Sequence, residues 1–316
     1  MKTKKTALNT KELIYGIAGL VLFIILFTVV LNSYNREADK RSVEIVDEDK
    51  TQDHIKTSIA ITGIDPNKGE LSARIFMNPE GSFINGKGKL SKDITVYINA
   101  ASVKQEFVFQ KDKLISPIDV TLSLYDGLAS DYPFDKHKAD LYFYIETKGG
   151  KDSTGQIEDI PVSSQTDFLG SVQGYTIDAE KGEKTDDETN VIYIDIERSS
   201  SVKFFAYFVF TAMWLLCLIV VFMTLSVIVR RRKIELGMFA FMSAMIFALP
   251  SLRNMQPMSP PIGTIMDYTS FFWAEGLVAL CLVTLVFTWL LRPGAKEIKA
   301  AEIRHEEELK NEKLKQ

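Results

Sequence analysis

The chain has little of what disulfide bonding and metal binding require. Its 316 residues include two cysteines and three histidines. Cys217 and Cys281 both lie inside long apolar runs, where a free cysteine packs as a small apolar side chain, so we expect residues 32–203 to contain no disulfide. His54, His137 and His305 are far apart in sequence, and none stands at metal-ligand spacing. The sequence therefore predicts no metal site.

Motifs of common enzyme classes are also missing. The chain contains no G-x-S-x-G elbow, no P-loop and no H-E-x-x-H pair. Calcium binding is an alternative for the acidic runs at 47–50 and 185–189, but they lack the spacing of an EF-hand loop, and we interpret them as solvated loops. We predict a protein that is not an enzyme, with no catalytic residues and no cofactor.

Positive charge is scarce where nucleic-acid binding would need it. Residues 32–203 hold 21 Lys and Arg against 31 Asp and Glu, a net charge of −10, whereas the whole chain has −4. Nucleic-acid binding requires a basic face, so we predict no nucleic-acid partner.

What the sequence does have is long apolar runs. Residues 13–31 and 204–229 carry no charge and are long enough for a bilayer core, which needs about 20 residues in helical form. Residues 236–252 form a shorter run, and the last run covers 268–291 if Glu275 is included. We predict four transmembrane helices.

The basic residues give the predicted helices an orientation. Lysines and arginines cluster before the first run, after the second and after the fourth, which places all three clusters on one side only if there are four spans. We predict a bacterial cell (cytoplasmic) membrane protein with residues 1–12 and 292–316 cytoplasmic, and residues 32–203 and a 253–267 link outside. A cleaved signal peptide is the alternative for the first run, but its apolar core is long and no small-x-small cleavage site follows, which favours an uncleaved signal anchor.

The exterior region has the pattern of short strands. Residues 32–53 are polar and indicate a stalk. From residue 54 to 203 apolar residues alternate with polar ones, as in 71–77, and turn signals such as Asp126-Gly127 and Lys148-Gly149-Gly150 separate the segments. The predicted fold is α+β: an extracytoplasmic antiparallel β-sandwich plus four transmembrane helices.

The segment at 131–137, DYPFDKH, is the most distinctive exterior motif. Pro133 fixes its own φ and favours an extended Tyr132, which holds an aromatic–proline–aromatic tip rigid with Asp135 beside it. An ordered hairpin entry is one interpretation, and a tip that docks onto the outer link is the other. The link offers prolines and an arginine, so we predict docking with Asp135 in salt-bridge reach of Arg198 or Arg253. The residues predicted to couple the domain to the membrane are Tyr132, Pro133, Phe134, Asp135, Arg198, Arg253, Pro260, Pro261 and Asp267.

Two carboxylates lie within or beside the predicted spans. Ionisable groups inside a membrane are costly and are often functional. Glu275 is placed to reach the outer surface or to pair with Arg253, and Glu235 stands at the inner end of the third span. Both are candidate intramembrane or pore carboxylates.

The chain resembles an uncharacterised bacterial membrane-protein family that is filed as a domain of unknown function. That family has an N-terminal span, an extracytoplasmic domain with a Tyr-Pro-Phe-Asp motif, three C-terminal spans and a patterned last loop. The matching loop residues here are Leu252, Arg253, Asn254, Pro257, Pro260, Pro261, Ile262, Gly263, Asp267, Phe272 and Trp273.

The order of elements is also similar, more loosely, to that of pentameric ligand-gated channels. Those channels place a β-sandwich with a Phe-Pro-Phe-Asp loop before a helix that runs inward. This chain departs from them because the fourth channel helix and the cysteine pair are missing, and the third span has Ser243 as its main polar residue.

Two functions follow from these observations. The first is a non-enzymatic membrane protein whose sandwich binds an extracytoplasmic ligand or protein. The alternative is an oligomeric ion channel or transporter subunit that uses Glu235, and a homo-oligomer is left open for both. The lipid bilayer is a partner in either case.

The topology gives a direct prediction. Reporter fusions after residues 10, 120, 233 and 300 should lie inside, outside, inside and inside, because the three basic clusters share the cytoplasmic side. An exported reporter at residue 233 would contradict the four-span arrangement.

Overall fold

The computed structural model describes residues 53–99, 104–151, 157–182 and 189–292, together with isolated positions between 14 and 35. These residues form two compact units. The β-rich unit extends to Ala206 and includes Pro260–Thr264, and the helical unit contains Tyr207–Ser259 and the residues from Ile265 onward. The predicted first span, the stalk and both tails fall largely outside the described residues.

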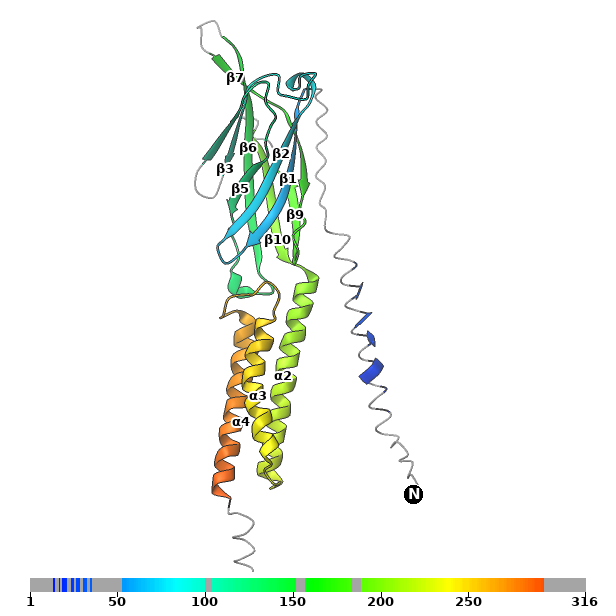
Figure 1. Ribbon diagram of the computed structural model, residues 1–316, viewed down its shortest axis with the longest axis vertical. Helices are drawn as coiled ribbons and strands as arrows, with labels where there is room; N and C mark the ends of the chain where they lie inside the picture. The colour runs from blue at the N-terminus through cyan, green and yellow to red at the C-terminus, as the bar shows by residue number, and fades with distance from the viewer. Residues whose placement is uncertain are drawn as a thin grey trace, which may run out of the picture. The chain divides into compact units, whose positions relative to one another are not determined.

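Strands of the β-rich unit form two sheets in the described part of the chain (Figure 1). The four-stranded sheet has the order β5-β2-β1-β8, and the six-stranded sheet has the order β4-β3-β6-β10-β9, with β7 paired to β6. The pairs are antiparallel except for β1 with β8. The strands are β1 (Ile55–Asp65), β2 (Glu70–Pro79), β3 (Ile94–Asn99), β4 (Lys104–Phe109), β5 (Ile118–Ser123), β6 (Lys136–Lys151), β7 (Ile157–Pro161), β8 (Ser164–Leu169), β9 (Tyr175–Lys181) and β10 (Asn190–Arg198).

Alternate side chains of both sheets contribute to one hydrophobic core. Leu71 and Ile75 of β2 and Ile94 and Ile98 of β3 are all at most 1 % exposed, and their strand neighbours are more exposed. The period of two places every second residue on the same side of a strand, so the alternation predicted from the sequence is confirmed at these positions.

The predicted turn at Lys148-Gly149-Gly150 was wrong. The structure continues β6 through these residues to Lys151, and the pairing with β7 shifts register between Lys148 and Lys151. Glycines are tolerated inside a strand where a bulge interrupts the ladder, so here they mark an irregular strand rather than its end.

The helices are α2 (Ser200–Val229), which belongs to the helical unit from Tyr207 onward, and α3 (Leu236–Asn254) and α4 (Phe272–Leu291), which lie entirely within that unit. A π-turn at Asp267–Phe271 leads into α4. The segments Ser200–Val229, Leu236–Asn254 and Asp267–Leu291 are long and apolar enough to cross a membrane. These three candidate spans support a membrane protein.

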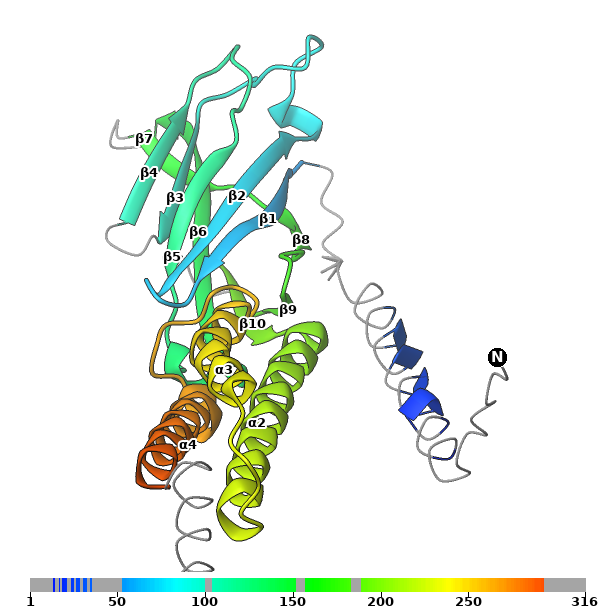
Figure 2. The same cartoon turned by 60° about the horizontal axis from the view of Figure 1, so that its bottom comes forward.

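The ends of two helices meet within the helical unit. The Arg292 guanidinium, just after α4, donates hydrogen bonds to the carbonyl oxygens of Val227 and Arg232 at the end of α2, at 2.8 and 2.9 Å. The carboxyl ends of α2 and α4 are therefore neighbours (Figure 2). Arg292 and the basic residues at 230–233, which are part of the topology prediction, lie at this one end.

Candidate functional site

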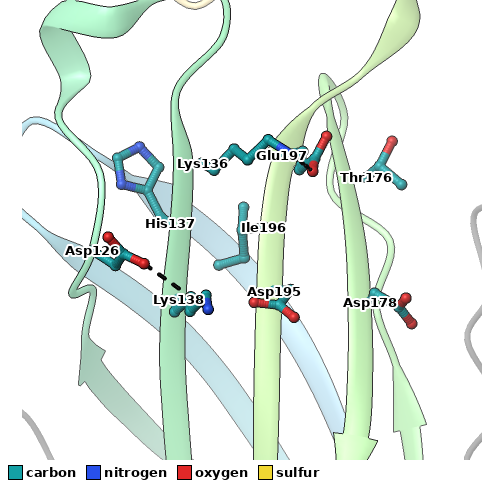
Figure 3. Close-up of a pocket in the computed structure, with 9 residues that line it drawn as sticks. All are labelled: Asp126, Lys136, His137, Lys138, Thr176, Asp178, Asp195, Ile196 and Glu197. Carbon is teal, nitrogen blue, oxygen red and sulfur yellow. Dashed lines mark ion pairs between the residues drawn. The ribbon is translucent and has the colours of Figure 1, made fainter.

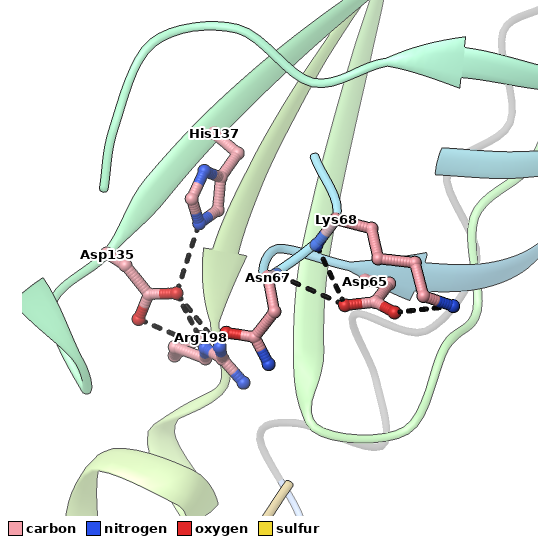
Figure 4. A network of polar contacts seen from close by, with 6 residues as sticks. All are labelled: Asp65, Asn67, Lys68, Asp135, His137 and Arg198. Atoms are coloured by element: carbon pink, nitrogen blue, oxygen red, sulfur yellow. Dashed lines mark hydrogen bonds and ion pairs between the residues drawn. The ribbon is translucent and has the colours of Figure 1, made fainter. Parts of the chain in front are cut away.

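A buried ion pair forms where the β-rich unit leads into α2. Asp135 stands one residue before β6 and is 2 % exposed, and Arg198 is the last residue of β10 and is 5 % exposed. The Arg198 Nε lies 3.0 Å from Asp135 Oδ1 and 2.9 Å from Oδ2, and Arg198 Nη2 lies 2.9 Å from Oδ2 (Figure 4). The ion pair predicted between Asp135 and Arg198 is therefore present. Such charge-assisted bonds are stronger than neutral ones.

Two tyrosine rings enclose the Arg198 guanidinium. Its Cζ lies 5.2 Å from the ring centroid of Tyr132 and 4.7 Å from that of Tyr175, both within cation–π range. Tyr132 is fully buried, and Tyr175 is the direct cross-strand partner of Arg198 on β9. Tyr132 thus packs inward, and Phe134 is the aromatic of the 131–137 segment that is exposed.

His137 is the second partner of Asp135. Its Nε2 lies 3.1 Å from Asp135 Oδ2, and the ring is 4 % exposed. The loop before η2 (Ala129–Asp131) packs closely over this position, because a Cβ on Gly127 would lie 1.7 Å from the Lys136 carbonyl oxygen and 3.2 Å from His137 Nδ1. Gly127 also has a φ of +90°, which glycine adopts without strain.

These contacts set the charge of the buried carboxyl. Burial by itself would raise the pKa of Asp135, but hydrogen bonds from His137 and Arg198 and the Arg198 charge outweigh burial and hold the pKa below its ordinary value. Asp135 is therefore kept ionised opposite a matched cation.

The ion pair leads directly into α2. Ser199 is fully buried, its N–H donates to the Gly174 carbonyl oxygen at 3.0 Å, and its Oγ accepts the Val202 N–H at 3.4 Å. This is the bonding of an N-cap serine, which satisfies a free donor at a helix start. Next to it, Glu197 pairs with Lys203 at 3.3 Å.

A second buried Arg–Asp pair lies in the helical unit. Arg253, in the last turn of α3, donates from Nε to Asp267 Oδ1 at 2.8 Å and from Nη2 to Oδ2 at 2.7 Å. Both side chains are buried, and this two-pronged geometry joins α3 to the π-turn before α4. Asp267 is thus an ion-pair partner of Arg253 within the helical unit.

The outer link is divided between the two units. Its centre, Pro260–Thr264, groups with the β-rich unit, and the residues on both sides group with the helices. Pro260 is buried and Pro261 is exposed. The predicted docking of 131–137 onto the link stays a prediction.

The two candidate carboxylates have different surroundings. Glu235 is exposed and precedes α3 without capping it through its side chain. Glu275, in the first turn of α4, is half-buried, and its Oε2 has no hydrogen-bond partner among the described residues. Neither position forms an ion pair within 4.0 Å in the described part of the chain.

Sequence reasoning found the carboxylate and the arginine but missed His137 and Tyr175. The Asp135–His137 spacing of two was available as a signal, since residues i and i+2 share one side of an extended chain. Tyr175 gave no such signal because its position opposite Arg198 depends on the register of β9 with β10.

Two family models match this chain. Residues 45–196 match a domain of unknown function (DUF4436), and residues 198–292 match a second domain of unknown function (DUF8686). The chain joins two domains of unknown function. Asp135 thus belongs to the DUF4436 region and Arg198 is the first matched residue of the DUF8686 region, so the buried ion pair connects the two. No curated protein matches the chain.

The lowered pKa of Asp135 predicts how its contribution depends on pH. A carboxyl whose pKa falls on folding stabilises the protein above its unfolded pKa of about 3.9, and this contribution is lost as the pH falls through the folded value. Above about pH 5, Asp135→Asn should therefore show its largest decrease in melting temperature relative to the parent. This gap between the two melting temperatures should narrow toward pH 3.

The matched control is Asp119→Asn, which removes a carboxylate from an exposed pair with Arg74. We expect it to change the melting temperature much less, because water screens exposed pairs. A gap for Asp135→Asn that stays constant or widens on acidification would show that the ionised carboxyl does not stabilise the fold.

Proposed function

We propose that this is a non-enzymatic membrane protein whose β-rich domain binds a ligand or envelope partner outside the cell and is coupled to α2 by the Asp135–Arg198 pair. One observation carries the proposal. The buried pair joins Asp135, just before β6, to Arg198 at the end of β10, and α2 begins two residues after Arg198. A load on the sheet is then transmitted to the helix without a flexible linker.

The membrane arrangement completes the proposal. The two sheets are taken to form a β-sandwich, and residues 13–31 to form a fourth span that stays attached as a signal anchor. Both termini are placed in the cytoplasm and the β-rich domain outside a bacterial cell membrane. The basic clusters in the sequence and the shared end of α2 and α4 support this orientation.

The outer link serves as a second joint in this proposal. The Arg253–Asp267 pair fixes the link at the helices, and the grouping of Pro260–Thr264 with the β-rich unit supports a coupling role for its centre. Pro260 and Pro261 reduce the entropy lost when the link is held in one conformation.

Amide hydrogen exchange on the full chain in lipid nanodiscs tests the coupling. The Ser199, Val202 and Lys203 amides are hydrogen-bonded at the start of α2. Arg198→Met keeps a long side chain but removes the charge, so we expect these amides to exchange at least tenfold faster, since local opening becomes easier.

The matched control is Arg74→Met, which removes an exposed arginine from the four-stranded sheet. Its exchange at the start of α2 should equal that of the parent. Tyr175→Leu offers a milder test than Arg198→Met, because it removes one ring from the guanidinium and keeps the ion pair. Unchanged exchange at α2 in both the Arg198 and the Tyr175 variants would refute the coupling.

A further inference from the structure

The outward face of the six-stranded sheet carries exposed tyrosines, two of which bond the same carboxylate. The Tyr125 hydroxyl donates to Asp140 Oδ1 at 2.5 Å, and the Tyr142 hydroxyl donates to Oδ2 of the same residue at 3.4 Å. Tyr193 lies directly across the β10–β6 pair from Asp140. Tyr125, Tyr142 and Tyr193 are 47, 37 and 47 % exposed, so three large aromatic residues are accessible on this side of the sheet.

The hydrogen bonds from the Tyr125 and Tyr142 hydroxyls hold the two rings in place and do not favour ionisation of the hydroxyls. The hydrogen bond to Asp140, followed by burial and the Asp140 charge, raises the pKa of Tyr125 to about 12. The pKa of Tyr142 is also raised, by burial and then by Asp140. The hydroxyls of Tyr125 and Tyr142 therefore stay protonated, while both residues are still exposed.

The same face carries more carboxylates than cations: Asp126, Asp178, Asp195 and Glu197 line its pocket together with Lys136 and Lys138. Asp195 of β10 lies directly opposite Asp178 of β9, and like charges in that position are destabilising. Lys138 is the other cross-strand neighbour of Asp195, but its ammonium is 3.9 Å from Asp126. Among the described residues, no cation lies within 4.0 Å of the carboxylates of Asp140, Asp178 or Asp195. A cation supplied by a partner would relieve this repulsion.

A pocket of about 580 Å³ opens on this face (Figure 3). Asp126, Lys138, Asp178 and Asp195 line it, and the Lys136–Glu197 pair, at 2.5 Å, lies at one end. Tyr125 forms a β-bridge with Lys138, so the tyrosine cluster continues from the lining of the pocket. Pocket and tyrosines together form one surface, which we call the tyrosine–aspartate face.

We propose that the tyrosine–aspartate face binds a basic polypeptide segment, with lysine or arginine side chains over the tyrosine rings and paired with Asp140, Asp178 and Asp195. This rests on the proposed role of the β-rich domain as a binding module and names the class of partner. Charge complementarity decides the occupant: tyrosine rings attract a cation to their faces, and among the described residues no cation lies within 4.0 Å of the three carboxylates. The carboxylates lie on three adjacent strands about 4.8 Å apart, so several separate cationic groups fit better than one.

Binding to the full chain in zwitterionic nanodiscs tests this inference. The probe is a fluorescent peptide of alternating lysine and serine, with a glutamate–serine peptide as its counterpart, in about 150 mM salt where charges are screened beyond about 8 Å. We expect the lysine peptide to bind and the glutamate peptide not to bind. The double variant Asp178→Asn/Asp195→Asn should weaken binding at least tenfold, and Tyr193→Leu should weaken it several-fold.

The control is Glu70→Gln/Glu80→Gln, which makes the same charge change in the other sheet. Glu70 is the first residue of β2 and Glu80 follows its last residue, and both are exposed. Its affinity should stay within twofold of the parent. If both double variants weakened binding equally, the binding would depend only on the overall charge of the domain, and the inference would be overturned.

Two other outcomes would also overturn it. Tetramethylammonium that binds the face and displaces the peptide would identify a small organic cation as the occupant instead. If the lysine peptide did not bind the parent, a basic polypeptide would be excluded as the partner. The proposed coupling is tested separately, because exchange at α2 is measured without any ligand.

Discussion

The structure depends on keeping one carboxylate ionised inside the protein. Removing Asp135 and Arg198 from water is costly, and their attraction compensates only if the geometry is good and further hydrogen bonds are present. The surroundings meet this condition: His137 bonds the carboxylate, and the rings of Tyr132 and Tyr175 cover the guanidinium. Removal of one partner from such a pair costs about 3–5 kcal/mol, because the other charge is left buried alone. We propose that the pair fixes the geometry at the start of α2.

The same solution occurs in the helical unit. Arg253 and Asp267 are buried and bonded at two points, and both stand where a helical segment ends or begins. An arginine fork fits a carboxylate in one orientation, which lysine does not achieve. Each unit thus contains a buried Arg–Asp pair next to the end of an apolar helix.

Much of this organisation could be predicted from local pattern. The alternation of apolar and polar residues predicted the strands around Leu71 and Ile94, and the long apolar runs predicted the three described helices. The YPFD segment led to the prediction of the Asp135–Arg198 pair. The rest required tertiary structure. Tyr175 meets Arg198 only through strand register, and the Asp178–Asp195 repulsion is visible only once β9 and β10 are paired. The predicted turn at Gly149 failed because a bulge and a turn use the same residues.

The most direct test of the account is a double-mutant cycle on the buried pair. The free energy of unfolding of the parent, Asp135→Asn, Arg198→Met and the double variant is measured for the full chain in one detergent. If the pair acts as a unit, the double variant should be less destabilised than the sum of the single variants by about 1.5 kcal/mol or more. Additivity within about 0.3–0.5 kcal/mol would mean that the two residues act independently, and the account would be wrong.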